Sequence, residues 1–330
     1  MKYYDIRERS GRLRALNIVI GGRGIGKSYS ALSFALEQSQ PFIYLRNTAV
    51  QMEESCTQFG NPFKRINKDF GRGVYMAAEK RHYIIYEDDE EKGRKLLGYG
   101  AALSTFANLR GVDLSDVTLV IFDEFIERRR LSFNQFQAFV GFYETVNRNR
   151  ELQGEEPLKV ILLSNSQTLD NDILSGYGLV QRIVDMKKSG TKTYMTSDLY
   201  LELPDSDISE AKANTANYRL IAGSAAAREA LSNEFAYDNF GNIEKKNLNE
   251  YRPLCRIDTG AGYANFWKHK SRSEIYVCGT CHSSMKEYAA DQSLLFDYEY
   301  GIYFRQLQAR KLVYFDSFQT KQMVDKLFNC

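Results

Sequence analysis

The feature that most constrains the fold is a glycine-rich run near the start of the chain. Residues 21–28 read Gly-Gly-Arg-Gly-Ile-Gly-Lys-Ser and match the spacing G-x-x-x-x-G-K-S/T in full. A short β-branched run at 16–20 precedes it, and a stretch with helical spacing from Lys27 to about Gln38 comes after it. Such a strand, loop and helix aim backbone N–H groups and a helix dipole at one phosphate group. The sequence therefore predicts a P-loop domain that binds a nucleoside triphosphate.

The parts of this loop have separate expected roles. Lys27 should reach the β- and γ-phosphate oxygens, and the Ser28 hydroxyl should bind Mg²⁺. ATP and Mg²⁺ are therefore the expected cofactors. The predicted nucleotide-binding residues are Gly21, Gly22, Arg23, Gly24, Ile25, Gly26, Lys27, Ser28 and Tyr29.

A second apolar run ends in two acids. The predicted strand at 117–122 is followed directly by Asp123 and Glu124. Asp123 at the strand tip can bind Mg²⁺ through water, and Glu124 beside it can polarise the attacking water. This adjacency is typical of P-loop ATPases with an additional strand and a catalytic glutamate, the ASCE class.

Other short apolar runs alternate with helical stretches. Strands are expected at 42–45 and 160–163, hairpins at 74–103, and a helix at 134–146. Short buried strands that alternate with helices indicate a parallel α/β sheet.

Two polar positions are further candidates for catalysis. Asn165 comes after the strand at 160–163, where it can sit beside the γ-phosphate as a sensor or form an Asx turn. Arg148 and Arg150 lie just past the predicted helix. An arginine at a domain rim can act in trans on a neighbour's ATP, although spacing alone favours a solvated helix end.

Together these motifs resemble the DNA-packaging ATPases of phi29-like tailed phages. The order and spacing agree through roughly residues 15–205 and the similarity is weaker beyond. The P-loop alone would not single out this family. Far more specific is the phrase Arg-Gly-Ile-Gly-Lys-Ser-Tyr joined to Phe-Asp-Glu-Phe-Ile and to Asn-Arg-Asn-Arg-Glu. The resemblance lies in the runs at 17–29, 42–46, 120–126, 145–151 and 163–165.

The resemblance implies a homo-oligomeric ring, expected to be a pentamer, at the portal vertex of a procapsid. The ring would use ATP to push double-stranded DNA inward, and in some relatives a structural packaging RNA takes part. It would act in the cytoplasm of the infected bacterial host, transiently attached to the portal. Arg148 matches the trans-acting arginine finger of the family. Arg46, which ends the strand at 42–45, matches an arginine proposed to touch the active site or its switch.

The DNA is expected to be gripped by its phosphates. Arg128, Arg129 and Arg130 form the densest basic cluster of the chain, in a loop where the family has basic residues that face the channel. A second candidate consists of Lys64, Arg65 and Lys68. Contacts to phosphate carry no sequence information, which suits a motor that must move any DNA.

The pattern changes near Pro204. Residues 208–233 are rich in Ala, Ser and Asn and read as a helical linker. Three strand-like runs come next at 253–257, 263–267 and 274–278, then a helix at about 284–298, a strand at 312–315 and a helix at 318–328. This is the element order of a small RNase H-like α+β fold. The predicted domains are a P-loop ATPase at 1–203, a linker at 204–240 and an RNase H-like docking domain at 241–330.

Larger terminase motors carry a two-metal nuclease in such a domain. Asp258 and Asp316 each end a predicted strand, but Asp316 with Gln319 also reads as a capping box for the last helix. Glu287 and Asp325 read as solvated helix residues. The resemblance favours a docking module without nuclease activity. Two alternatives stay open: a terminase-like motor with an active nuclease, and a P-loop protein that binds nucleotide without hydrolysing it.

The net charge, the length of the apolar runs and the cysteines bear on the partners and the cellular compartment of the protein. The net charge of +2 means that any nucleic-acid contact depends on local patches. No run approaches the roughly 18–20 apolar residues that span a bilayer, so no membrane contact is expected. The first residues contain no apolar h-region, so no secretory signal is expected. The cysteines are odd in number and scattered along the chain, which is typical of free thiols. The run Cys278-x-x-Cys281-His282 resembles a metal site, but no second pair of ligands follows at the spacing of a zinc site.

Overall fold

The computed structural model divides into two compact units, which are described separately. The larger unit comprises Met1–Gly176 and Met186–Asp238, and the smaller one Tyr177–Asp185 and Asn239–Cys330. The sequence-based boundaries at 203/204 and 240/241 stay predictions. The residues that the structure describes are 3–80, 82–89, 93–109, 113–127, 131–166, 168–204, 207–224, 227, 231, 235, 238, 241–260 and 262–328.

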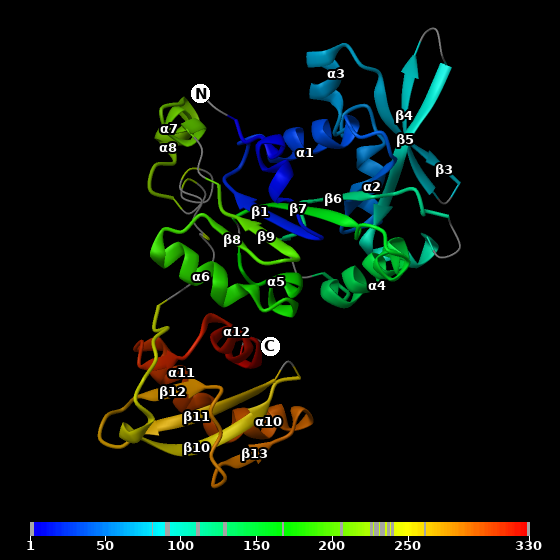
Figure 1. The fold of residues 1–330 in the computed structure, drawn as a ribbon. Helices are drawn as coiled ribbons and strands as arrows, with labels where there is room; N and C mark the ends of the chain where they lie inside the picture. The colour runs from blue at the N-terminus through cyan, green and yellow to red at the C-terminus, as the bar shows by residue number, and fades with distance from the viewer. Residues whose placement is uncertain are drawn as a thin grey trace. The chain divides into compact units, whose positions relative to one another are not determined.

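The larger unit is built on one sheet, whose described strands have the order β3-β4-β5-β2-β6-β7-β1-β9-β8 (Figure 1). All neighbours from β5 to β9 in this order pair in parallel, and β3, β4 and β8 add antiparallel edges. The strand β7 lies between β1 and β6. The strand bounds are β1 Leu16–Gly21, β2 Phe42–Arg46, β3 Val74–Glu79, β4 His82–Asp89, β5 Gly93–Ala102, β6 Leu119–Asp123, β7 Lys159–Asn165, β8 Thr193–Met195 and β9 Leu199–Glu202.

The register of the parallel strands explains where polar groups gather. Gly21 pairs with Asn165 at the ends of β1 and β7, and Asp123 pairs with Leu163. Because parallel strands point the same way, their carboxyl ends share one edge of the sheet. The strands before these ends are buried almost throughout, so the sheet is a rigid support for that edge.

The two individual helices predicted for this unit are present, whereas α2, α3, α5 and α6 were not predicted. Helix α1 begins at Lys27 and α4 ends at Asn147, within two residues of the predicted bounds. The predicted linker contains α7 and α8, which cluster with the larger unit. The α-helices of this unit are α1 Lys27–Leu36, α2 Ala49–Ser55, α3 Lys64–Phe70, α4 Gln135–Asn147, α5 Asp172–Gly176, α7 Asp207–Ala213 and α8 Ala216–Leu220, with 3-10 helices at Ile6–Arg12, Leu103–Leu109 and Arg150–Gln153. Helix α6 Leu179–Ser189 begins in the segment Tyr177–Asp185, which clusters with the smaller unit, and ends in the larger unit.

The smaller unit contains a second sheet with the order β13-β10-β11-β12-β14. The strands β10, β11 and β12 form an antiparallel meander, while β13 pairs in parallel with β10 and β14 in parallel with β12. Their bounds are β10 Tyr251–Asp258, β11 Tyr263–His269, β12 Ile275–Cys278, β13 Lys286–Tyr288 and β14 Val313–Phe315. Helices α10 Ser293–Phe296 and α11 Ile302–Ala309 are joined by a π-helical turn, and α12 is Phe318–Phe328.

The helix expected at 284–298 of this unit was wrong in its first part. The segment 284–298 was expected to be helical, but its first part forms β13 and the α-helix begins only at Ser293. The reason is tertiary: Lys286–Tyr288 extends the sheet beside Cys255–Ile257, and this places the Tyr288 side chain in the core at 0% exposure.

No helix among the described residues is long and apolar enough to cross a membrane.

Candidate nucleotide-binding site

The phosphate loop connects β1 to α1 with two glycines in the left-handed region. Gly24 has φ +71°, and Gly26, which caps the start of α1, has φ +100°. A side chain at either position would be strained, which explains the glycines of the motif. Ile25 between them is fully buried in the core of the unit, so the loop is anchored by an apolar side chain.

Lys27 lies inside the curl of this loop. Its Nζ donates to the carbonyls of Gly21 at 3.0 Å and Gly22 at 2.8 Å and to Asn165 Oδ1 at 3.1 Å. Burial lowers the pKa of Lys27 to about 8. The predicted sensor Asn165 and the predicted phosphate-binding lysine are thus in direct contact.

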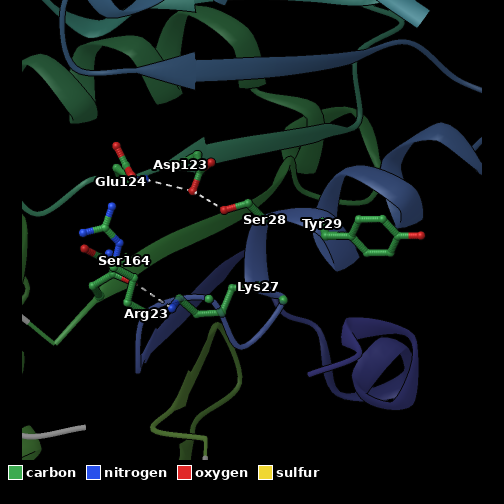
Figure 2. Close-up of a pocket in the computed structure, with 10 residues that line it drawn as sticks. Arg23, Lys27, Ser28, Tyr29, Asp123, Glu124 and Ser164 are labelled. Carbon is green, nitrogen blue, oxygen red and sulfur yellow. Dashed lines mark hydrogen bonds between the residues drawn. The ribbon is translucent and has the colours of Figure 1, made fainter. Parts of the chain in front are cut away.

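Ser28 and Asp123 meet at the next position. The Ser28 hydroxyl donates to Asp123 Oδ1 at 2.8 Å, and the Glu124 N–H donates to the same oxygen at 3.1 Å (Figure 2). Asp123 is buried, and this burial raises the pKa of its carboxyl group. The structure therefore brings the two predicted magnesium ligands together.

Arg46 joins the two acids from β2. Its Nη2 lies 2.6 Å from Glu124 Oε2, and its Nη1 lies 4.0 Å from Asp123 Oδ2. Tyr44, also on β2, accepts from Arg46 Nη1 at 3.3 Å and donates to Asp123 Oδ2 at 3.4 Å. Burial raises the pKa of the Tyr44 phenol, so it stays a donor. The predicted contact of Arg46 with this site is present, whereas Tyr44 was missed because it read only as part of a strand.

A buried amide network supports the turn at Glu124, a non-glycine residue with φ +54°. Asn47 Nδ2 donates to the Glu124 carbonyl at 3.0 Å, and Gln135 Nε2 donates to both Asn47 Oδ1 and the Phe125 carbonyl at 2.6 Å. Asn171 Nδ2 in turn donates to Gln135 Oε1 at 2.7 Å. Left-handed backbone at such a residue costs about 1–3 kcal/mol. The network offsets this cost and fixes the backbone under Glu124.

These groups surround a cavity of about 330 Å³, in the size range of small-molecule sites. The ring of Tyr29 points away from the acids, and its hydroxyl donates to Asp69 at 3.0 Å (Figure 2). Gly21 and Gly22 take part through the carbonyls that hold Lys27, not as lining. The cavity is lined by Arg23, Gly24, Gly26, Lys27, Ser28, Tyr29, Asp123, Glu124, Ser164 and Asn165.

The residues present fit a nucleotide with Mg²⁺. The Ser164 hydroxyl oxygen in the cavity wall is buried and has no hydrogen-bond partner among the described residues. A buried polar atom without a partner is costly, and a ligand oxygen would remove that cost. No cluster of three His, Cys, Asp or Glu side chains occurs in the described part of the chain. Mg²⁺ needs none, since it is commonly held by one or two carboxylates together with phosphate and water.

Arg148 and Arg150 differ sharply in their surroundings. Arg150 is buried and donates to the carbonyls of Ser115 and Val117, so it braces its own fold. Arg148 caps the end of α4 with φ +45°, and its side chain is 44% exposed beside Asp113, with Nη1 3.1 Å from Asp113 Oδ1. It is not among the residues that line the cavity. Of these two arginines, Arg148 is the one placed to reach outward.

Comparison with known proteins identifies the family. A family model described as Podovirus DNA encapsidation protein (Gp16) matches residues 1–290. The chain belongs to this family. The resemblance inferred from the sequence motifs is therefore confirmed, and the protein is a viral DNA-packaging protein.

Two characterised relatives of this encapsidation protein are also packaging proteins. The DNA packaging protein of Bacillus phage B103 is 31% identical over 244 residues, which is 72% of this chain and 69% of the relative. The DNA packaging protein of Bacillus phage phi29 is 29% identical over 252 residues, 74% of this chain and 69% of the relative.

Solved structures agree on the fold of the encapsidation protein. A chain of the bacteriophage phi29 viral genome packaging motor assembly matches with a TM-score of 0.69 and 22% identity, over 100% of this chain and 99% of the other. A chain of the phi28 gp11 DNA packaging motor matches with a TM-score of 0.61 and 20% identity, over 99% of this chain and 96% of the other. The predicted mixed α/β fold with a large parallel sheet is thus confirmed.

The predicted DNA contacts of this family member are only partly visible. Arg128, Arg129 and Arg130 lie outside the described residues. The second cluster lies on α3, where Arg65 pairs with Asp69 at 2.9 Å and Lys64 lies over the ring of the exposed Phe59. Part of the positive charge of that cluster is therefore compensated.

The acids of the smaller unit are engaged by neighbouring groups. Asp258 accepts from the Gly260 N–H at 2.8 Å, and Asp316 accepts from the Gly279 N–H at 2.8 Å and from Thr320 Oγ1 at 2.6 Å. The capping box expected from Asp316 and Gln319 was wrong in register. Ser317 directly precedes α12 and accepts from the Thr320 N–H at 3.1 Å.

The remaining candidates of this unit also have other partners. Glu287, expected on a helix, lies on β13 and pairs with Arg256 at 2.6 Å. Asp325 on α12 accepts from Gln308 at 3.0 Å. Cys278 is buried and Cys281 exposed, with Arg256 Nη1 at 3.1 Å from the Cys281 sulfur.

Proposed function

We propose that this chain is the ATPase of a DNA-packaging motor, which hydrolyses ATP to drive double-stranded DNA into a procapsid. The observation that carries the proposal is one cavity lined by Lys27, Ser28, Asp123 and Glu124, with Ser28 and Asp123 in hydrogen-bond contact. Membership in a DNA encapsidation family supports the coupling to DNA.

The loop supplies the phosphate site. Lys27 would exchange its bonds to the Gly21 and Gly22 carbonyls for phosphate oxygens, since its ammonium is already buried in the curl. Ser28 and Asp123 would hold Mg²⁺, which when bound offsets negative charge on the phosphates. Ser164 would donate to a ligand oxygen, and Asn165 would register the state of the site through its bond to Lys27.

Glu124 is the proposed general base for the attacking water. Its carboxylate reaches the cavity and is 55% exposed, yet Arg46 holds one of its oxygens at 2.6 Å. The oxygen that Arg46 holds already accepts a charged hydrogen bond, so it is not available to accept one from the attacking water. We infer that Arg46 is a positioning residue and that hydrolysis occurs after the release of Glu124 from it.

Arg148 is the proposed trans-acting finger. Its exposure, its position outside the cavity and its match to the family motif support action on a neighbouring subunit's ATP. A finger of this kind requires a neighbouring subunit at each site, which the proposed ring, a pentamer, would supply.

The proposed partners are those of a packaging motor. Arg128, Arg129 and Arg130 are proposed to hold DNA phosphates, and the smaller unit to dock on the portal or procapsid, with a structural packaging RNA as a further partner. The protein would work in the cytoplasm of the infected host. The engagement of Asp258 and Asp316 weighs against an active nuclease, and the location of Glu124 weighs against nucleotide binding without hydrolysis.

The direct test is ATP turnover by the full chain with and without double-stranded DNA. Lys27→Ala should lose nucleotide binding, because Lys27 touches phosphate in the ground state. Glu124→Gln should keep binding and lose about 10²–10⁴-fold in turnover, since it removes a general base. Near wild-type turnover in Glu124→Gln would refute the catalytic assignment, and DNA-independent turnover would refute the motor.

A further inference from the structure

Lys212 approaches the phosphate loop from a part of the chain that no nucleotide-binding motif covers. It lies on α7, in the segment after the last strand of the large sheet (Figure 1). Its Nζ donates to the carbonyl of Arg23, at the middle of the loop. The place that a Cβ on Gly24 would occupy is 2.8 Å from the same Nζ. Both segments belong to the larger unit, so this contact lies within one compact body.

The charged groups around Lys212 indicate which kind of ligand it could bind. Burial lowers the pKa of Lys212, and the charge of the neighbouring cation Arg23 lowers this pKa further. The charge of Lys212 in turn contributes to the lowered pKa of Lys27. In the described part of the chain, no carboxylate forms an ion pair with Lys212. Its bond is to a single neutral carbonyl, although an ammonium group has three donors.

Cations gathered on one loop repel each other and favour an anion between them. The loop itself is built to bind such an anion, because its amide groups and the start of α1 point at one place. Lys212 contacts the loop at Arg23 and Gly24, two residues that line the cavity, although Lys212 itself is not among the lining residues. Lys27 is buried inside the curl, so the two lysines approach one loop from different elements.

We propose that Lys212 is a second phosphate-binding cation of the nucleotide site, contributed by α7. This proposal rests on the proposed nucleotide binding at the loop and adds a residue to it. When nucleotide is present, the Lys212 ammonium binds a phosphate oxygen, and the bound nucleotide then holds α7 against the loop. The segment after the sheet thereby becomes sensitive to the occupancy of the site.

The test measures binding of a non-hydrolysable ATP analogue with Mg²⁺ to the full chain by calorimetry. Lys212→Ala should weaken binding on the order of tenfold to a hundredfold, the usual effect of losing one charged hydrogen bond. Lys212→Gln can still donate to the Arg23 carbonyl but has no charge, and it should weaken binding almost as much. The matched control is Arg219→Ala on α8, an exposed cation whose guanidinium donates to Asn214.

The outcomes separate this proposal from the proposed function. If Lys27→Ala loses binding while Lys212→Ala keeps wild-type affinity, the site is correct and the role of Lys212 is refuted. If Lys212→Gln binds as well as the wild type, the lysine is only a structural tie and the proposal fails. If Lys27→Ala binds the ATP analogue with normal affinity, the proposed nucleotide site is wrong, and the proposed role of Lys212 is refuted as well.

Discussion

Acids stand at strand ends in both units, but they are used in opposite ways. In the larger unit, Asp123 at the tip of β6 meets a side-chain hydroxyl and a cavity, and Glu124 beside it meets a guanidinium. In the smaller unit, Asp258 and Asp316 lie at the ends of β10 and β14 and accept from backbone N–H groups of nearby turns. Asp123 also accepts from a backbone N–H, so what marks it and Glu124 as a candidate site is the cavity that they line together with the phosphate loop.

The prediction with the largest expected effect on turnover concerns Arg148, the side chain that a neighbouring subunit is proposed to supply to the site. Arg148→Ala should keep ATP binding and lose about 10³–10⁵-fold in DNA-stimulated turnover, because a finger stabilises charge only in the transition state. Mixing Glu124→Gln with Arg148→Ala subunits should restore some turnover, since some interfaces pair an intact base with an intact finger. Turnover is measured for each mutant and for the mixture.

The neighbouring Arg150 is the control for that experiment. Its buried guanidinium braces the carbonyls of Ser115 and Val117, so Arg150→Ala should reduce thermal stability instead of acting through a partner. Normal turnover in Arg148→Ala would show that the site needs nothing from a second subunit.

The two acidic strand ends also differ in the residues that come next along the chain. After β6 come Arg128, Arg129 and Arg130, whereas after β10 comes a glycine-containing turn. Neutralising the three arginines together should weaken DNA binding for all sequences alike and reduce the log–log salt slope by about 0.9 for each lost phosphate contact. A salt titration of DNA affinity checks this. An unchanged slope would indicate that the DNA phosphates are bound by the second basic cluster, Lys64, Arg65 and Lys68.

The smallest expected effect concerns the acids of the smaller unit. The purified protein should leave linear DNA uncut with Mg²⁺ or Mn²⁺. Asp316→Ala should lower the free energy of unfolding by about 1 kcal/mol, because it removes acceptors for Gly279 and Thr320. Asp291→Ala, an exposed acid of the same unit, is the control. DNA cleavage that disappears in Asp258→Ala would show that the acids of the smaller unit form an active site as well, which contradicts the contrast between the units.

Local patterns predicted the features that local chemistry determines. The phosphate loop, the tip of β6 and most strands were predictable because glycine spacing and apolar runs act over a few residues. The amide network of Asn47, Gln135 and Asn171 was not, since its members are far apart in sequence and look like ordinary polar residues. The strand β13 was missed for a similar reason, because only pairing with β10 makes it extended. Lys212 carried no signal, since no motif connects α7 to the loop.

The fixed backbone under Glu124 also sets a timescale. Since Asn47 and Gln135 hold the carbonyl groups of Glu124 and Phe125, the backbone stays in place and the carboxylate leaves Arg46 through rotation of side chains. Rotamer changes of exposed side chains take picoseconds to nanoseconds, whereas loop and domain rearrangements take microseconds to milliseconds. The exchange of partners by Glu124 would then never limit the cycle, and the pace of a turnover would be set by slower events elsewhere in the molecule.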